Sequence, residues 1–261
     1  MKDSLLLQYS RQIMLPEIDL AGQELLADSC VAIVGMGGLG CVASTYLATS
    51  GVGTLKIIDF DRIELSNLQR QILYSPEDIG KLKIDVAEKK LCAINPSISI
   101  DKLNMKICDA ENLDWLTNVD LIIDASDNFE TRFLINNLSL KICKPLVSGA
   151  AIRFEGQVSV FNEQEKSPCY ECLYDNVGNN EETCATNGVI APLLGIIGSV
   201  QALESIKILS KIGSSLNGTL LIINSKTMEW NKIKLNKDSK CPRCSNPSNF
   251  GTSFSNKLIE E

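Results

Sequence analysis

The sequence predicts an α/β fold: a doubly wound, Rossmann-like and mostly parallel sheet, with an antiparallel C-terminal extension and a zinc-bound C-terminal knuckle. Three observations predict it. Apolar strand-like runs alternate with helical segments between residues 30 and 126, an order typical of parallel β-α-β units. A glycine-rich turn, GMGGLG, joins the first run to the first helix. Two separate Cys-x-x-Cys pairs in the second half of the chain can supply four metal-binding thiolates.

The individual elements follow from local patterns. Residues 3–29 indicate two short helices with polar breaks. Strands are predicted at 30–35, 54–59, 97–104, 119–126, 145–150 and 157–161. Helices are predicted at 41–51, 81–93, 128–143 and 189–211. The segments 219–225 and 228–236 suggest a hairpin, and the polar stretch 163–188 indicates a long loop of a kind that is usually functional or disordered.

Length and composition set the class of protein. The chain has 261 residues, 44% of them hydrophobic, which suffices for one large α/β domain. We expect residues 1–250 to form this single domain and residues 251–261 to form a disordered tail. The net charge of −7 disfavours a nucleic-acid or anionic-membrane partner, because phosphate contacts need clustered lysine and arginine. With no run of about 20 apolar residues and no secretory signal, a membrane span is not expected and a cytoplasmic location is the default.

Histidine is absent from the sequence. Its absence removes Ser-His and Cys-His catalysis, and any zinc ligand set that contains histidine. A zinc site must therefore use cysteine, and any reaction must proceed without imidazole as a base.

The turn Gly35-Met36-Gly37-Gly38-Leu39-Gly40 has the position of a dinucleotide-type fingerprint, between a strand and a helix. Glycines let the backbone approach phosphates, and the helix N-terminus supplies N–H donors. Asp59 ends the next strand, where a carboxylate accepts hydrogen bonds from ribose hydroxyls. The pattern predicts nucleotide binding; the alternative is a turn that serves only tight strand–helix packing. No Lys-Ser/Thr pair follows, so it is not a Walker A loop.

Charged and amide side chains near this turn favour ATP over NAD. They are Asp61, Asn67, Arg70, Lys83, Asp127 and Asn128. Arginine and lysine offset the charge of a triphosphate, and a carboxylate can hold Mg²⁺. The alternatives are a solvated, salt-bridged face for Arg70 and Lys83, and the N-cap of the following helix for Asp127.

The cysteine pairs are Cys169-x-x-Cys172 and Cys241-x-x-Cys244. Four thiolates make a closed structural Zn²⁺ site, which would tie the C-terminal end to the mid-chain loop. A redox-active pair is the alternative. Cys184 lies in the polar loop, where it is either a nucleophile toward an activated carboxyl group or an unreactive loop thiol.

Taken together, the motifs resemble those of the ubiquitin-activating-like enzymes, the family that includes MoeB, ThiF and HesA. The matching stretches are YSRQI, GMGGLG, DFDRIELSNLQRQ, GKLK, SDNFETR, PCYEC, TCATNGVIAPLLGIIGS and CPRC. They cover nearly the whole chain, and LVSGAAIRFEGQVSVF and GLGCVAS look closer to MoeB-type than to ThiF-type members.

The resemblance implies an ATP-dependent adenylyltransferase that acts on a ubiquitin-like sulfur-carrier protein, of the type that forms the small subunit of molybdopterin synthase. The carrier's C-terminal glycine carboxylate would attack the α-phosphate of Mg-ATP to give an acyl-adenylate and pyrophosphate, and sulfur would then displace AMP. The same resemblance implies a nucleotide-binding half at about 30–150, a carrier-binding and zinc half at about 151–250, and a possible sulfur donor such as a cysteine desulfurase.

Individual roles are carried over from matching positions of the family. Asp59 would hold the ribose, Asp127 Mg²⁺, and Arg70 and Lys83 the phosphates, while Arg11 would reach the partner's site in a homodimer. Residues around the nucleotide would include Gly38, Ser66, Asn67, Leu68, Gln69 and Arg70. Cys169, Cys172, Cys241 and Cys244 match the zinc ligands, and Cys184 matches a cysteine that some relatives use covalently.

Three alternatives stay open at this point. A ThiF-like enzyme would adenylate the thiamine sulfur carrier instead. An NAD-dependent oxidoreductase would rest on the glycine fingerprint and Asp59 alone. A non-catalytic nucleotide-binding module would keep the fold without the chemistry.

Overall fold

The computed structural model describes residues 2–108, 113–164, 166–174 and 187–245. Cys184 and the proposed tail 251–261 lie outside the described residues.

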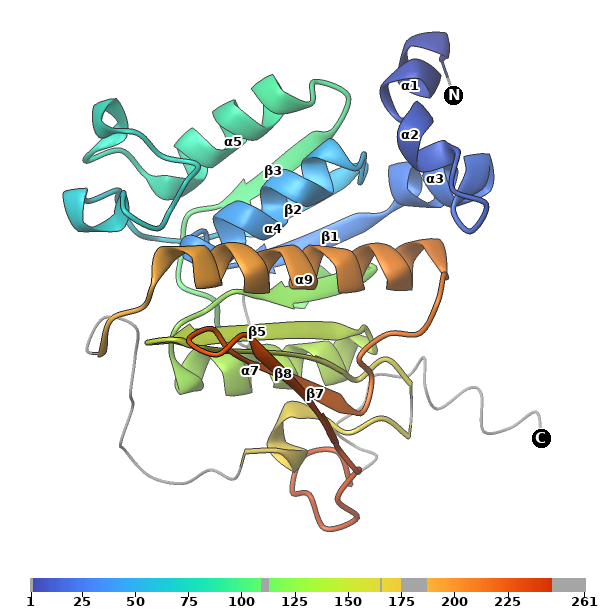
Figure 1. Ribbon diagram of the computed structural model, residues 1–261, viewed down its shortest axis with the longest axis vertical. Helices are drawn as coiled ribbons and strands as arrows, with labels where there is room; N and C mark the ends of the chain where they lie inside the picture. The colour runs from blue at the N-terminus through green and yellow to red at the C-terminus, as the bar shows by residue number, and fades with distance from the viewer. Residues whose placement is uncertain (1, 109–112, 165, 175–186, 246–261) are drawn as a thin grey trace.

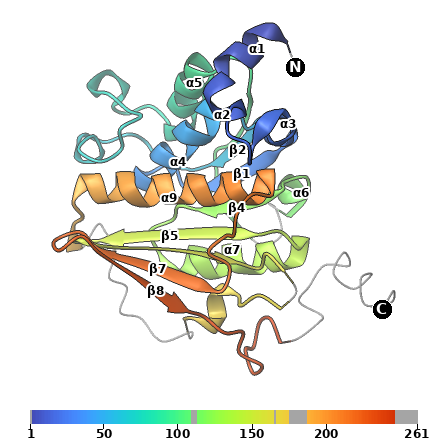
Figure 2. The same ribbon diagram turned by 45° about the vertical axis from the view of Figure 1, so that its right-hand side comes forward.

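Eight strands of the described chain form one sheet in the order β3-β2-β1-β4-β5-β6-β7-β8. Neighbouring strands from β3 to β5 pair in parallel, whereas the pairs from β5 to β8 are antiparallel. The bounds are β1 Cys30–Val34, β2 Thr54–Ile58, β3 Ser99–Leu103, β4 Leu121–Asp124, β5 Leu146–Ile152, β6 Glu155–Phe161, β7 Thr219–Asn224 and β8 Glu229–Lys234. The predicted doubly wound sheet with an antiparallel extension is confirmed, including the hairpin β7–β8 (Figure 2).

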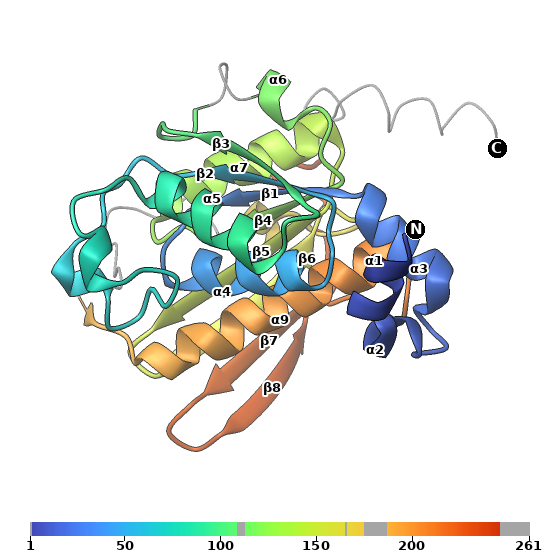
Figure 3. The ribbon, with the colours of Figure 1, turned by 90° about the horizontal axis from the view of Figure 1, so that it is seen from above.

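Helices cover both faces of the sheet. Their bounds are α1 Asp3–Gln8, α2 Ser10–Ile13, α3 Asp19–Asp28, α4 Gly38–Thr49, α5 Lys83–Ile94, α6 Leu113–Leu116, α7 Phe129–Ile142 and α9 Ala191–Ser210, with short 3₁₀ turns at Leu65–Asn67, Pro76–Asp78 and Tyr170–Cys172. Helices α4, α5 and α9 lie on one side of the sheet (Figure 3). Helix α7 packs on the other side.

Alternation along the strands produces these two cores. In β1, Val31 and Ile33 face the core under α4 and α9, while Ala32 and Val34 face the core under α7. Successive side chains of a strand point to opposite faces, so a continuous apolar run is buried on both sides.

Helix α9 is the central helix of the larger core and runs beside α4 (Figure 1). By length and composition alone it is apolar enough to cross a membrane, with a mean hydropathy of 1.4. Its buried residues, such as Leu193 and Ile197, pack into the core against α4, β5 and β6. This packing accounts for its apolar composition.

The N-terminal region differs from the prediction of two helices, because it forms three helical segments. Tyr9 separates α1 from α2 and is buried, and its hydroxyl contacts Asn95 Nδ2 at 2.8 Å and Ser97 Oγ at 3.2 Å. Helix α4 also begins earlier than expected, at Gly38 inside the glycine turn.

Candidate active site

A cavity of about 660 Å³ opens at the carboxyl ends of the parallel strands. Its walls include residues that directly follow β1, β2 and β4, among them Gly35, Asp59 and Ala125. In this topology the chain reverses its winding direction between β1 and β4, and ligands bind in the crevice at that point.

The glycine turn serves both packing and access to this cavity. Gly35 has a φ of +94°, and a Cβ there would lie 2.8 Å from Ala125 O. A Cβ on Gly40 would lie 1.9 Å from Gly35 O, so Gly40 is needed for packing and does not line the cavity. Gly37 and Gly38 do line it, at the start of α4. The helix therefore presents its N-terminal end to any bound phosphate.

Asp59 is held in place at the end of β2. Its Oδ2 accepts a hydrogen bond from the Met36 N–H at 2.7 Å, and its Oδ1 accepts one from the Asp61 N–H at 2.8 Å. Burial raises the pKa of Asp59, although the nearby charge of Lys83 and both backbone hydrogen bonds oppose the shift. The carboxylate is thus anchored to the glycine turn on one side of the cavity.

Lys83 begins α5 and is buried, with a relative exposure of 5%. Its Nζ forms an ion pair with Asp61 Oδ2 at 2.7 Å. Arg70 is half-buried and donates from Nη1 to Ser66 O at 2.8 Å. The solvated-face alternative is therefore wrong for Lys83, whose ammonium group lies inside the wall of the cavity.

Asp127 and Asn128 divide the roles at the start of α7. Asn128 is the N-cap, and its Oδ1 accepts a hydrogen bond from Thr131 N at 2.9 Å. Asp127 is exposed at the cavity and accepts a hydrogen bond from Asn128 Nδ2 at 3.3 Å. The N-cap alternative for Asp127 is therefore wrong, and its carboxylate faces the cavity.

Most of the predicted nucleotide-site residues line the cavity. These are Gly35, Gly37, Gly38, Asp59, Asp61, Asn67, Arg70, Lys83, Asp127 and Asn128. The cavity lining does not include Gly40, Ser66, Leu68 or Gln69. In the 3₁₀ turn Leu65–Asn67, Asn67 is the buried residue, whereas Leu68 packs against the larger core. Arg11 lies on the exposed helix α2, away from this cavity.

The sequence argument missed several lining residues, including Arg62, Gln71, Met105 and Arg132. For Arg132 a signal was present. It stands four residues after the N-cap Asn128, and residues spaced by four share one face of a helix.

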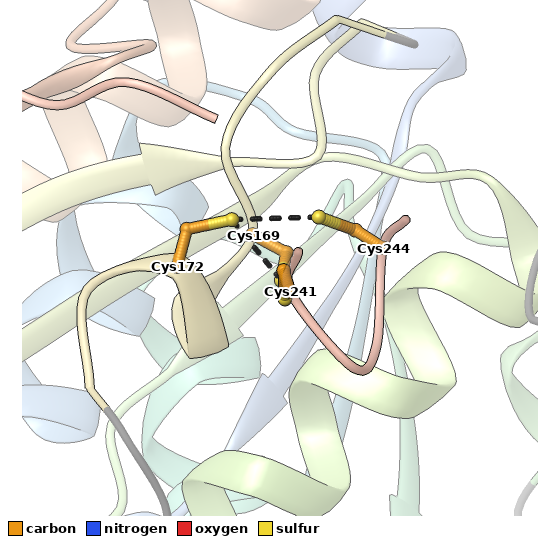
Figure 4. Close-up of side chains that lie close together, drawn as sticks. All are labelled: Cys169, Cys172, Cys241 and Cys244. Atoms are coloured by element: carbon orange, nitrogen blue, oxygen red, sulfur yellow. Dashed lines mark hydrogen bonds between the residues drawn. The ribbon is translucent and has the colours of Figure 1, made fainter. Parts of the chain in front are cut away.

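Four cysteine thiols converge at the far end of the antiparallel half (Figure 4). The sulfur atoms of Cys169, Cys172, Cys241 and Cys244 lie within 4.8 Å of one another. Measured contacts are 3.9 Å for Cys169–Cys172, 3.6 Å for Cys169–Cys241 and 3.4 Å for Cys172–Cys244. A tetrahedral site with Zn–S bonds of about 2.3 Å needs sulfur atoms about 3.8 Å apart. The cluster therefore fits a four-thiolate zinc ion, and the redox alternative does not explain why all four thiols meet.

Comparisons with known proteins agree with this geometry. The ThiF family matches residues 9–243. The molybdopterin-synthase adenylyltransferase of Escherichia coli K12 is 45% identical over 244 residues, covering 94% of this chain and 98% of that protein. The sulfur carrier protein ThiS adenylyltransferase of the same strain is 40% identical, covering 94% and 97%.

Solved structures with the same fold include E. coli MccB bound to ATP. It has a TM-score of 0.81 and 25% sequence identity, covering 91% of this chain and 73% of that chain. E. coli MccB with MccA-N7isoASN has a TM-score of 0.82 and 26% identity, covering 94% and 76%.

Proposed function

The chain belongs to the ThiF family and is an adenylyltransferase, and we propose that it uses ATP to activate the C-terminal glycine carboxylate of a ubiquitin-like sulfur-carrier protein for molybdenum cofactor biosynthesis. The observation that carries this proposal is the 42–45% identity to molybdopterin-synthase adenylyltransferases over nearly the whole chain. The resemblance of the sequence motifs to this family is confirmed. Adenylyl transfer replaces the oxidoreductase and the non-catalytic module as the activity of this fold.

The reaction needs positioning more than proton transfer. A carboxylate oxygen of the carrier attacks the α-phosphorus of ATP, the bond to the β-phosphate oxygen breaks, and pyrophosphate leaves with the electron pair. A C-terminal carboxylate is already ionised at neutral pH, so no general base is required. This accounts for an active site in a chain without histidine.

The cavity walls supply what such a transfer requires. The start of α4 offers backbone N–H groups, and Arg70 and Lys83 offer positive charge to the phosphates. The Asp59 carboxylate is anchored where it can accept hydrogen bonds from ribose hydroxyls. Lys83 is held in place by Asp61, so little reorganisation is needed as charge develops on the leaving group.

Asp127 is the residue that would hold Mg²⁺. Its carboxylate faces the cavity, and oxygen ligands of this kind suit Mg²⁺. When bound, Mg²⁺ supplies positive charge to the polyphosphate.

We propose that Zn²⁺ bound by the four cysteines braces the antiparallel half. The sulfur spacing supports this, and the neighbouring thiols of Cys169 and Cys244 lower the pKa of the Cys172 thiol, whose thiolate form binds metal.

A homodimer is part of the proposal, with Arg11 of each chain reaching the site of the other. Helices α1 and α2 bury none of their residues, and Leu7 and Met14 are 78% and 69% exposed. Short helices with exposed apolar side chains gain stability from a covering partner. A cytoplasmic location and a sulfur donor such as a cysteine desulfurase complete the proposal.

The thiamine sulfur carrier is a second candidate substrate, because the ThiS adenylyltransferase of E. coli is 40% identical over most of both chains. The deciding measurement is ATP–pyrophosphate exchange with purified carriers that end in Gly-Gly. We expect exchange that depends on the molybdopterin-type carrier and is weaker with the thiamine-type carrier. The absence of exchange with every carrier would refute the proposed function.

A further inference from the structure

Arg132 lies on α7, in the wall of the cavity, five residues after Asp127. Its Nη2 donates a hydrogen bond to Ser126 O at 3.1 Å, and its guanidinium carbon lies 5.6 Å from the centre of the Phe129 ring. Its Nε is buried and has no hydrogen-bond partner among the described residues. The guanidinium is therefore fixed in orientation while part of its donor fork remains unused.

The nearest negative charge stabilises Arg132 in its cationic form without satisfying that fork. Asp124 is fully buried and accepts hydrogen bonds from Ser126 Oγ at 2.6 Å and Ser148 Oγ at 2.8 Å. Burial opposes the charge of Arg132, but the Asp124 carboxylate outweighs it and raises the pKa of Arg132. Within the described ranges, no carboxylate forms an ion pair with Arg132.

The other cations of the cavity wall already have protein partners. Lys83 pairs with Asp61, Arg62 donates to Gly80 O, and Lys106 pairs with Glu130. Arg70, which donates to a backbone carbonyl, lies with Lys83 on the phosphate side of the cavity. Arg132 differs in position, because α5 and α7 cover opposite faces of the sheet. Positive charge thus enters the cavity from two sides.

The reaction brings two anions together, the polyphosphate and the attacking carboxylate, and each needs its own counter-charge at a fixed place. We propose that Arg132 binds the C-terminal carboxylate of the acyl substrate and orients it toward the α-phosphate. This assignment rests on the proposed function. A guanidinium fork matches the two oxygens of a carboxylate, and the substrate would supply the partner that Nε lacks. The ligand it fits is an extended peptide end with a free carboxylate.

The first test compares Arg132→Gln and Arg132→Lys with the wild-type protein. We expect Arg132→Gln to raise the KM for the carrier by about tenfold or more, because a charge-assisted pair is lost. The Kd for ATP, measured by calorimetry with a non-hydrolysable analogue, should stay within about twofold. Arg132→Lys keeps the charge but not the fork, so its KM should fall between the two. Lys141→Gln removes one charge from the exposed end of the same helix and serves as the matched control.

The second test needs no variant. Phenylglyoxal modifies arginine, and mass spectrometry can follow Arg132 in the intact wild-type protein. A peptide with the carrier's C-terminal sequence and a free carboxylate should slow modification of Arg132, whereas the same peptide with a C-terminal amide should not. Equal protection by both peptides, or by neither, would overturn the assignment.

The outcomes separate this proposal from the proposed function. If wild-type protein shows no carrier-dependent exchange, the proposed function fails. If it shows exchange while Arg132→Gln keeps the wild-type KM for the carrier, or loses ATP affinity in parallel, the role of Arg132 is refuted and the function stands.

Discussion

Arg243 donates a hydrogen bond from Nε to Glu171 Oε1 over 2.9 Å, and this ion pair joins the two Cys-x-x-Cys turns. Glu171 lies between Cys169 and Cys172, with only 4% of its side chain exposed, and it also accepts a hydrogen bond from Asn136 Nδ2 at 3.4 Å. The two turns are therefore held together by side chains that are not themselves metal ligands.

We predict that Glu171→Ala lowers the free energy of unfolding by about 2 kcal/mol, because it leaves Arg243 and Asn136 without a buried acceptor. Urea unfolding measures this change. The same variant should release zinc faster to a chromogenic chelator, since the supports of a metal site orient its ligands. Lys240→Ala, an exposed change beside the second turn, is the control. A Glu171→Ala protein with wild-type stability and zinc release would contradict the prediction.

The metal content gives a second prediction. Elemental analysis of the purified protein should find about one zinc per chain, as a closed four-thiolate site requires. Cys241→Ser should reduce this content and lower the melting temperature, because metal binding contributes folding free energy. Folded, metal-free wild-type protein with four reactive thiols would argue against the site.

Asp127 and Asn128 should separate activity from stability. Asp127→Ala is expected to lower carrier-dependent pyrophosphate exchange at least about 100-fold, as loss of transition-state charge stabilisation does, with little change in melting temperature. Asn128→Ala removes the N-cap of α7 and should lower the free energy of unfolding by about 1 kcal/mol. Thermal melts and exchange assays on both variants check the contrast. Normal turnover by Asp127→Ala would refute its metal role.

Asp78 provides a prediction for pH dependence. Burial opposes its charge, but hydrogen bonds from Lys90, Ser75 and Lys81 lower the pKa of Asp78 below its usual range. A carboxylate whose folded pKa is depressed stabilises the protein above its unfolded pKa of about 3.9, and this contribution is lost as the pH falls toward the folded pKa. Asp78→Asn should therefore lower the free energy of unfolding by about 2 kcal/mol at pH 7.

The difference between wild type and Asp78→Asn should shrink when urea unfolding is repeated below about pH 4. Asp85→Asn is a suitable control, because Asp85 pairs with Lys102 at 2.7 Å at the surface, and exposed pairs contribute little. A difference that does not change with pH would mean that the charge of Asp78 is not responsible.

Arg11 allows a test of the proposed dimer. Arg11→Ala and Asp127→Ala should each be nearly inactive alone. If Arg11 acts across a two-fold interface, a re-equilibrated equal mixture contains hybrid dimers with one intact site, which gives about a quarter of wild-type exchange activity. Analytical ultracentrifugation confirms that chains have exchanged. No recovery in mixed dimers would show that Arg11 does not act in trans.

The parallel half of the fold was predictable because its signals are local. Apolar runs such as 30–35 and the turn that follows them specify strand, turn and helix with few distant contacts. The break at Tyr9 was not predictable, since its hydroxyl contacts Asn95 across 86 residues of sequence. Likewise, only folding shows that Asn67 enters the cavity wall while Leu68 packs into the core. Asp127 and the cap Asn128 are adjacent in sequence, and only hydrogen-bond geometry separates their roles.

The packing of α9 also has a consequence for synthesis. Its main contacts are with α4, β5 and β6, all of which precede it in the chain. A ribosome therefore completes the docking surface before this apolar helix emerges. The segment most prone to aggregation or to mistaken insertion into a bilayer meets its own binding groove at once, and translation order protects the nascent chain.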